Sequence, residues 1–346
     1  MTDLWQHPWL SGLFGDPEMA ALLSPEAELS RMLRVEAAWT AAIAPKEDEE
    51  RITNAIMTAP IRPDDLTDGT ARDGLPVPDL VRLLKAHLEE ADQPCLHKGL
   101  TSQDVIDTSL ILMLKAALPI LTKRIRTLIA ALDALNRRDG ARSLMAATRM
   151  QAALPITASD RIGAWTRPML RLSDPMQDMA ERMKILQWGG PVGTRDPTLP
   201  ADTGTRFAAA LGLRDPGAAW HSDRSLLAEL AGTLSRVSGA TGKIGQDIAL
   251  LVQTEPSALQ LTGTGGSSAM PHKQNPVLAE LLVTLARKSA SDLSLMHHAL
   301  VHEQERSGSA WMLEWMILPQ MLMTTGRSLT AGHDLIGSVA RIGKDI

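Results

Sequence analysis

A helical pattern of roughly 30 residues follows Trp220–Arg224 and limits the folds open to this chain. A helix of that length extends about 45 Å at 1.5 Å per residue. Its apolar residues recur at helical spacing, along a line through Leu226, Leu230, Leu234, Val237, Ile244, Ile248 and Leu251. Because one helix cannot bury such a face alone, the pattern predicts a bundle of long helices.

The remaining sequence favours the same all-α class. Runs of β-branched and aromatic residues at period two are missing, and Leu, Ala and Met dominate, so no strand is expected. Residues 310–329 are apolar almost all round, which places that helix inside a large core or at an oligomer interface. Further helices are expected within 17–44 and over about 102–118, 118–136, 158–188 and 276–305.

The length of 346 residues allows a large core and two domains. Prolines and glycines between Pro60 and Pro78 break the early chain into loops and short helices. We therefore expect a small helical domain over residues 1–100 and a long-helix bundle domain over residues 101–346.

Composition excludes several classes of partner. The net charge of −5 gives no reason to expect nucleic acid. A single cysteine, Cys95, rules out an internal disulfide and fits the reducing cytoplasm. The N-terminus has no basic region before an apolar run, and Glu314 interrupts the most apolar stretch, so neither a signal peptide nor a membrane span is expected.

The segment Gly265–Pro276 concentrates chemically useful residues in one loop. It places two hydroxyls, a lysine and an asparagine after two glycines, and Pro276 suits the first turn of the next helix. A lone Gly-Gly-Ser-Ser run would be an ordinary surface loop. The complete string, with Lys273 and Asn275 at fixed spacing from Ser267, indicates a site.

Two other polar segments invite a structural explanation first. In His97–Asp104, Thr101 or Ser102 can cap a helix with Asp104 in its first turn, but a cap explains neither His97 nor Lys98. Residues 147–157 would by themselves be a polar patch on a helix kinked by Pro155.

Taken together, the three segments resemble the fumarase/aspartase superfamily. Gly265–Pro276 carries every fixed position of its signature G-S-S-x-M-P-x-K-x-N, and His97–Asp104 matches its H-x-G-x-T-S-x-D segment in full. The second region, T-H-x-Q-x-A-x-P-x-T, is matched from Thr148 to Thr157, except that Arg149 replaces the histidine. Several local runs are similar to the branch that acts on 3-carboxy-cis,cis-muconate, namely residues 13–16, 101–108, 189–194 and 242–249.

The resemblance implies a fumarase/aspartase-like long-helix bundle, assembled as a homotetramer whose active sites are each shared among three subunits. Typical members also have a small C-terminal helical domain. The sequence stops near where that domain would begin, so we expect this domain to be missing.

The resemblance also implies roles for individual residues. Ser267 would move the proton at the carbon next to a carboxylate, and Lys273 would stabilise both its alkoxide and the aci-carboxylate intermediate. Asn275 would donate to a substrate carboxylate. The expected substrate-binding residues are His97, Lys98, Thr101, Ser102, Thr148, Arg149, Gln151, Arg224 and Asn275, with Arg306 and His272 as further candidates. No metal or organic cofactor is expected.

The arginine at position 149 bears on which kind of leaving group the enzyme can expel. In the superfamily, the histidine at its position helps to expel an amine or hydroxide, which needs a proton. A lactone opened in reverse expels a carboxylate, which has a pKa of about 4 and needs none. The sequence therefore favours a cycloisomerase that interconverts 3-carboxy-cis,cis-muconate and 4-carboxymuconolactone, in aromatic degradation. Arginine can also bind a carboxylate through two hydrogen bonds.

Two alternatives remain open at this point. An amine-expelling lyase resembling adenylosuccinate lyase would need another acid, such as His97 or His221. A catalytically silent oligomer with a structural role is the other possibility, although intact Ser267, Lys273 and Asn275 argue against it.

Overall fold

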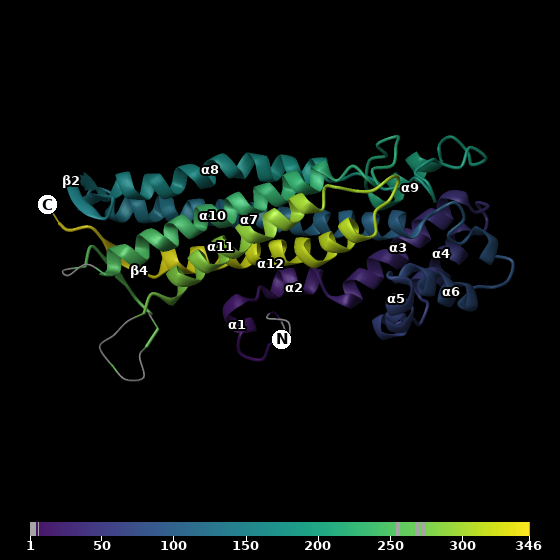
Figure 1. Cartoon of the computed structure of the whole chain (residues 1–346), viewed down its shortest axis with the longest axis horizontal. Coiled ribbons are helices and arrows are strands. Elements are labelled where there is room, and N and C mark those ends of the chain that lie inside the picture. The colour runs from purple at the N-terminus through teal and green to yellow at the C-terminus, as the bar shows by residue number, and fades with distance from the viewer. Residues whose placement is uncertain are drawn as a thin grey trace.

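The part of the chain that the structure describes is mainly helical, with four short strands, and its long helices set the long axis (Figure 1). This is a computed structural model, and it describes Trp5 and residues 7–253, 257–263, 265–266, 270 and 275–345. Its helices, strands and side-chain contacts are described for these residues only.

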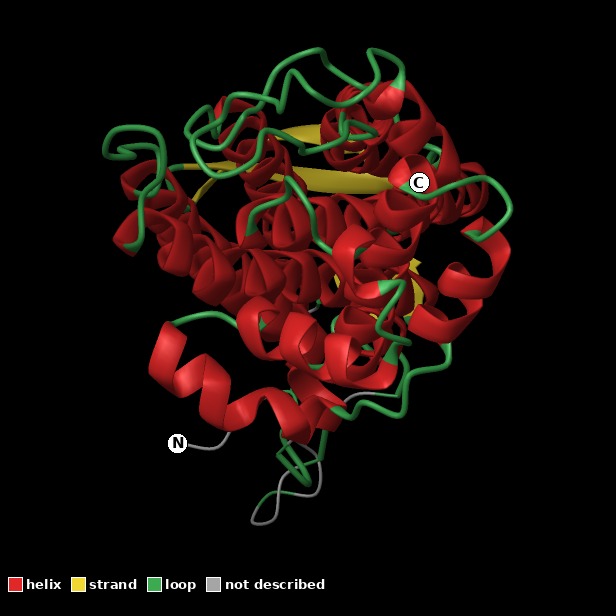
Figure 2. Cartoon of the chain, turned by 90° about the vertical axis from the view of Figure 1, so that its right-hand side faces the viewer, coloured by secondary structure: helices red, strands yellow, loops and turns green. Residues whose placement is uncertain are grey.

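Five long helices form the body of the molecule. α10 packs against α8, α11 and α12, and α7 packs against α8 and α12. Viewed from one end, these helices lie side by side (Figure 2). The predicted long-helix bundle is therefore confirmed. The five helices are α7 (Ser102–Asp139), α8 (Ala158–Arg182), α10 (Ser225–Gln253), α11 (Val277–His298) and α12 (Ser309–Gly337).

The apolar line predicted for α10 faces the core. Leu230, Leu234, Val237, Ile244 and Ile248 are all fully buried. Complete burial of such a side chain stabilises the fold by roughly 1.5–3 kcal/mol relative to exposure. The hydrophobic pattern thus determines which side of α10 meets its neighbours.

A single helix, α7, replaces the two helices expected over residues 102–136. It continues through Pro119, where the sequence indicated a boundary. Leu118, Leu121 and Ile125 are fully buried around this position. Their packing offsets the backbone hydrogen bond that proline cannot make, so the predicted break at residue 118 is wrong.

The shorter helices α3 to α6 and α9 gather at one end of the bundle, and α1 and α2 lie along its side (Figure 1). α3 packs against α4, α7 and α9. The predicted domain boundary near residue 100 falls in the loop before α7 and remains a prediction. The shorter helices are α1 (Ser11–Phe14), α2 (Pro17–Leu22), α3 (Pro25–Ile43), α4 (Glu49–Met57), α5 (Thr67–Asp73), α6 (Val77–His87) and α9 (Thr203–Leu211), with 3-10 turns at Pro63–Leu66 and Gln93–Cys95.

The expectation that the chain has no strand is wrong in detail. β1 (Ser143–Thr148) and β2 (Gln151–Thr157) form an antiparallel hairpin where a helix kinked at Pro155 was the simplest interpretation. β3 (Leu259–Leu261) pairs with β4 (Val339–Ile342). β2 lacks an alternating buried face, since six of its seven residues are exposed, so no strand pattern was visible in the sequence.

α7 is also the one described helix whose length and hydropathy would allow it to cross a membrane. However, 72% of its most apolar window is buried inside the protein. That burial is typical of a core helix. α12, which contains the stretch weighed as a span from the sequence, does not meet the same criteria.

Candidate active site

The loop before α7 positions His97 and Lys98. The Nδ1 atom of His97 lies 2.6 Å from Oε1 of Glu36, a residue of α3 that is fully buried. Burial lowers the pKa of His97, but the charge and hydrogen bond of Glu36 outweigh it, so this pKa is raised. His97 therefore keeps its proton to a higher pH than an ordinary histidine. Lys98 is exposed.

Asp104 holds the chain together around the start of α7. Its Oδ2 atom accepts hydrogen bonds from the backbone N–H groups of Thr101, at 3.0 Å, and Gly190, at 2.9 Å. Its Oδ1 atom accepts from Gly189 N–H at 2.9 Å and lies 2.8 Å from Nε2 of His221. Asp104 and His221 are both buried, which indicates a structural role for this pair.

A third cation reaches the same end of α7. Arg306, in the loop between α11 and α12, donates a hydrogen bond from its guanidinium to the Thr101 hydroxyl. Arg306 is exposed, Thr101 is 8% exposed and Ser102 is partly buried. Arg306 and the loop residues His97 and Lys98 thus bring positive charge to the start of α7.

Arg224, expected to bind substrate, lies in the interior instead. Its guanidinium donates two hydrogen bonds to Asp107, at 2.7 and 3.0 Å, and two to Glu314, at 2.9 and 2.5 Å. Asp107 also accepts from the indole N–H of Trp311 at 3.0 Å. Arg224 is 2% exposed, so within this subunit it links α7, α10 and α12 and does not face a binding site.

The β1–β2 hairpin presents the second polar segment at its tip. Arg149 and Met150 form the turn, with backbone φ angles of +49° and +66°. Thr148 pairs with Gln151 across the turn. Thr148, Arg149 and Gln151 are all exposed. The structure therefore brings these three predicted residues together and directs them outward.

The base of the signature loop is closed by two backbone hydrogen bonds. Gly265 N–H donates to Asn275 O at 3.0 Å, and Asn275 N–H donates to Gly265 O at 2.8 Å. The side-chain amide of Asn275 lies 3.3 Å from Gly266 O. A Cβ atom at position 265 would approach Val277 to 2.7 Å, which explains the glycine. Ser267, His272 and Lys273 lie outside the described residues.

One subunit does not bring the three segments together. His97 precedes α7 and Arg149 follows it. α7 has 38 residues and is therefore about 57 Å long. The base of the signature loop lies at the hairpin end of the bundle, opposite the end that carries α3 to α6 (Figure 1). A site containing all three segments would need more than one copy of the chain.

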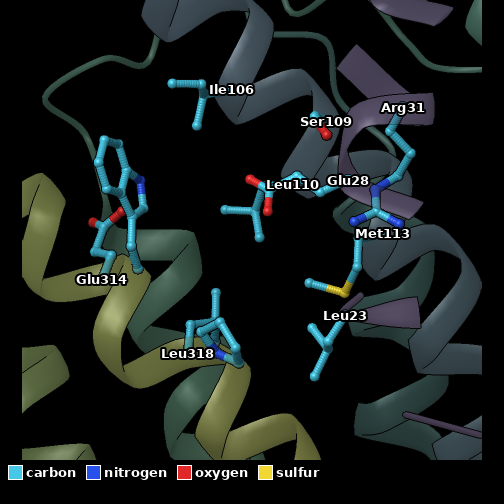
Figure 3. A pocket seen from close by; sticks show the side chains of 11 residues that line it. Leu23, Glu28, Arg31, Ile106, Ser109, Leu110, Met113, Glu314 and Leu318 are labelled. Atoms are coloured by element: carbon cyan, nitrogen blue, oxygen red, sulfur yellow. The ribbon is translucent and has the colours of Figure 1, made fainter. Parts of the chain in front are cut away.

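A separate hollow of about 150 Å³ lies between α2, α3, α7 and α12 (Figure 3). Ile106, Leu110, Met113 and Leu318 line it, and the buried Ser109 hydroxyl has no hydrogen-bond partner in the described structure. None of the predicted site residues lines this hollow, so it does not belong to the candidate site.

Sequence reasoning missed the contribution of Glu36. A glutamate in the apolar centre of the helix expected within 17–44 was the available signal, because carboxylates are seldom fully buried without a partner. That the partner is His97, 61 positions later, could not be read from the chain. Among the described residues, no group of three or more His, Cys, Asp or Glu side chains is placed to bind a metal.

Comparisons with known proteins agree on one family. The model of a family described as lyase matches residues 29–289. The chain is 31% identical to 3-carboxy-cis,cis-muconate cycloisomerase of Pseudomonas aeruginosa, covering 97% of this chain and 76% of that protein. It is 32% identical to the enzyme of that name from Bradyrhizobium diazoefficiens, covering 95% and 76%.

A solved structure extends the similarity to the fold. The 3-carboxy-cis,cis-muconate lactonizing enzyme from Pseudomonas putida superposes with a TM-score of 0.88 at 28% identity. The match covers 96% of this chain and 77% of that one. The bundle described above is therefore the fold of these enzymes.

Proposed function

The chain belongs to this fumarase/aspartase-like lyase family, and from that premise we propose that it interconverts 3-carboxy-cis,cis-muconate and 4-carboxymuconolactone. The observation that carries the proposal is Arg149, exposed at the hairpin tip where the superfamily pattern has a histidine. An arginine cannot serve as a general acid near neutral pH, because it does not release its proton.

The proposed reaction needs one proton and no further acid. In the closing direction, a substrate carboxylate oxygen forms a bond to a carbon of the conjugated system. The electron pair moves onto a neighbouring carboxylate, giving an aci-carboxylate. Ser267 then gives its proton to the carbon beside that carboxylate. Lys273 stabilises the serine alkoxide, which takes a proton from water before the next turnover, and opening of the lactone retraces these steps.

Arg149 contributes by binding rather than by proton transfer. The group that leaves in the opening direction is a carboxylate, which is stable as an anion near neutral pH. The planar guanidinium can hold a carboxylate through two parallel hydrogen bonds. Thr148 and Gln151, beside it at the tip, would add single hydrogen bonds.

A tricarboxylate substrate calls for several positive groups. His97, Lys98 and Arg306 supply them at the start of α7, where Thr101 and Ser102 add hydroxyls. Asn275 would bind a carboxylate from the signature loop. Arg224 fits this role less well than expected, since Asp107 and Glu314 already occupy its guanidinium.

The histidines considered for an amine-expelling lyase are poorly placed as acids. His221 is buried against Asp104, and Nδ1 of His97 is occupied by Glu36. A raised pKa also makes His97 a better permanent cation than a proton donor. These contacts favour the cycloisomerase over an enzyme resembling adenylosuccinate lyase.

We further propose a homotetramer in which three chains contribute to each site. The length of α7 supports sharing, because it separates His97 from Arg149. Met312 and Met316 of α12 are 44% and 63% exposed, an apolar surface that another copy would cover. A cytoplasmic location fits the single cysteine.

An absorbance assay tests the proposed function. Purified protein is mixed in turn with 3-carboxy-cis,cis-muconate, adenylosuccinate and argininosuccinate. We expect turnover of the muconate alone, seen as loss of its conjugated absorbance, and a rate lower by about 10²–10⁴-fold with Ser267→Ala. Turnover of a succinate compound instead would favour the amine-expelling lyase, and no turnover at all would favour a silent oligomer.

A further inference from the structure

The loop before α7 is held at two points by one face of α3. Glu36 contacts the ring of His97, and the indole N–H of Trp39 donates to the backbone oxygen of Lys98 at 2.9 Å. Glu36 and Trp39 are three residues apart on a helix and so lie on the same side of it. Both are fully buried, which makes them a rigid support for the loop.

His97 adopts an unusual backbone conformation in this loop. Its φ angle is +57°, in the left-handed region, and Gly99 follows at +76°. Glycine occupies this region freely, but another residue loses roughly 1–2 kcal/mol there. A strained histidine held by two buried side chains suggests that its exact placement is needed, since strain of this kind concentrates at functional sites.

His97 is the positive group that lies beside the buried carboxylate of Glu36. Its Oε1 atom contacts His97, whereas Oε2 is buried with no hydrogen-bond partner in the described structure. A buried carboxylate in this state is strongly unfavourable unless a positive group lies beside it. Protonated His97 provides that group.

Other charged groups act on the same ring. Asp104 of α7 favours the protonated form of His97, and Lys85 of α6 opposes it. Asp104 is already occupied by three backbone N–H groups and His221, so its charge acts only at a distance. Glu36 is therefore the main cause of the positive charge.

We propose that Glu36 is a positioning residue that fixes His97 as an imidazolium, so that the second ring N–H, on Nε2, binds a substrate carboxylate. The ring is 19% exposed, and its Nε2 atom makes no hydrogen bond within the described part of the chain. The identity of the substrate rests on the proposed function. The role of Glu36 rests only on this geometry.

Histidine NMR tests the role of Glu36 without any substrate. The His97 signal, identified by its loss in His97→Asn, is titrated in protein carrying 13C-labelled histidine. In the wild type we expect a pKa above 6.5, the ordinary value. Glu36→Gln should lower it by at least one unit, and Glu36→Asp should restore part of the shift.

Trp39→Phe is the matched control, because it removes the other support of the loop without changing a charge. The raised pKa of His97 should survive in this variant. An ordinary or lowered pKa in the wild type would overturn the proposal, even if Glu36→Gln does not fold. An equal fall in the pKa of His97 in Glu36→Gln and Trp39→Phe would also overturn the proposal, because Glu36 would then act only through packing.

Steady-state kinetics then test the contact with substrate. The KM for 3-carboxy-cis,cis-muconate should rise with pH as His97 loses its proton, and in Glu36→Gln this rise should begin at lower pH. A KM profile that is identical in both proteins would exclude the substrate contact. If the wild type does not convert muconate, the proposed function fails, while the NMR result still decides whether Glu36 charges His97.

Discussion

Arg149 and Met150 turn the β1–β2 hairpin with two consecutive left-handed residues. Such turns ordinarily use asparagine and glycine, which enter this region at little cost. The hairpin accepts two bulky residues instead and leaves Arg149 exposed. The strain is consistent with a side chain kept for its chemistry and presented to another copy.

Replacing Arg149 tests whether its planar fork binds substrate. Arg149→Ala should raise KM about tenfold or more, since a hydrogen bond to a charged group contributes about 1.5–3 kcal/mol. Arg149→Lys should raise it less, because charge remains. Met150→Ala controls for disturbance of the turn. Unchanged KM and kcat in both arginine variants would make Arg149 structural.

Ser267 is the residue proposed to transfer the proton to and from the substrate carbon. Ser267→Ala should lower kcat by about 10²–10⁴-fold, the usual contribution of an acid–base group, with little effect on substrate affinity. Stopped-flow or absorbance kinetics would measure both. Retention of more than about a tenth of the wild-type kcat would assign proton transfer to another residue.

The Glu36–His97 pair makes stability depend on pH in a definite direction. Because the folded pKa of His97 is raised, the pair stabilises fully below about pH 6.5 and loses this effect as pH rises through the folded pKa. At pH 6, Glu36→Gln should cost about 1.5–3 kcal/mol in unfolding free energy. The difference from wild type should shrink by pH 9, and a constant difference would contradict the assignment.

The helices show what local pattern can and cannot determine. α10 has 29 residues, close to the roughly 30 predicted, because its apolar line continues along almost the whole helix. α7 continues through Pro119 because Leu118 and Leu121, on either side of it, are fully buried. The local sequence does not reveal the parts of the chain that bury them. The hairpin escaped prediction because β2 is exposed and its turn contains neither glycine nor asparagine.

The site residues were likewise predictable where they are close together in the sequence, and not where their contacts are distant. The motifs identified which residues cluster at the loop before α7, at the hairpin tip and at the loop base, since each cluster is local in sequence. Arg224 was predicted to bind substrate because a tricarboxylate calls for several cations. Its partners Asp107 and Glu314 are 117 and 90 positions away, so only the fold reveals them.

Arg224 joins three helices, and its loss should be costly. Arg224→Met leaves Asp107 and Glu314 buried without their cation, which should lower the free energy of unfolding by about 3–5 kcal/mol. Arg182→Met is the control, since its pair with Glu229 is exposed and should contribute far less to the free energy of unfolding. Urea unfolding would compare them, and equal losses would contradict a central role for Arg224.

Within one chain, the segments predicted to form the site lie far apart. His97 and the base of the signature loop lie at opposite ends of the bundle, so a site containing both would need neighbouring copies (Figure 1).

Mixed oligomers test sharing directly. His97→Gln and Ser267→Ala should each be nearly inactive at low substrate concentration. Unfolding and refolding them together should restore some sites free of both changes, up to about a quarter of wild-type activity if mixing is random. Light scattering should detect a tetramer. A monomer, or a soluble mixed tetramer without recovered activity, would exclude shared sites but not the chemistry of Ser267.

The length of α7 has a further consequence for the enzyme in dilute solution. If no single chain holds a complete site, separated chains are inactive, however well folded. The initial rate would then rise more steeply than in proportion to protein concentration, until association is complete. Activity would thus appear only above a certain concentration of the chain. A cell containing only a little of it would gain almost no turnover.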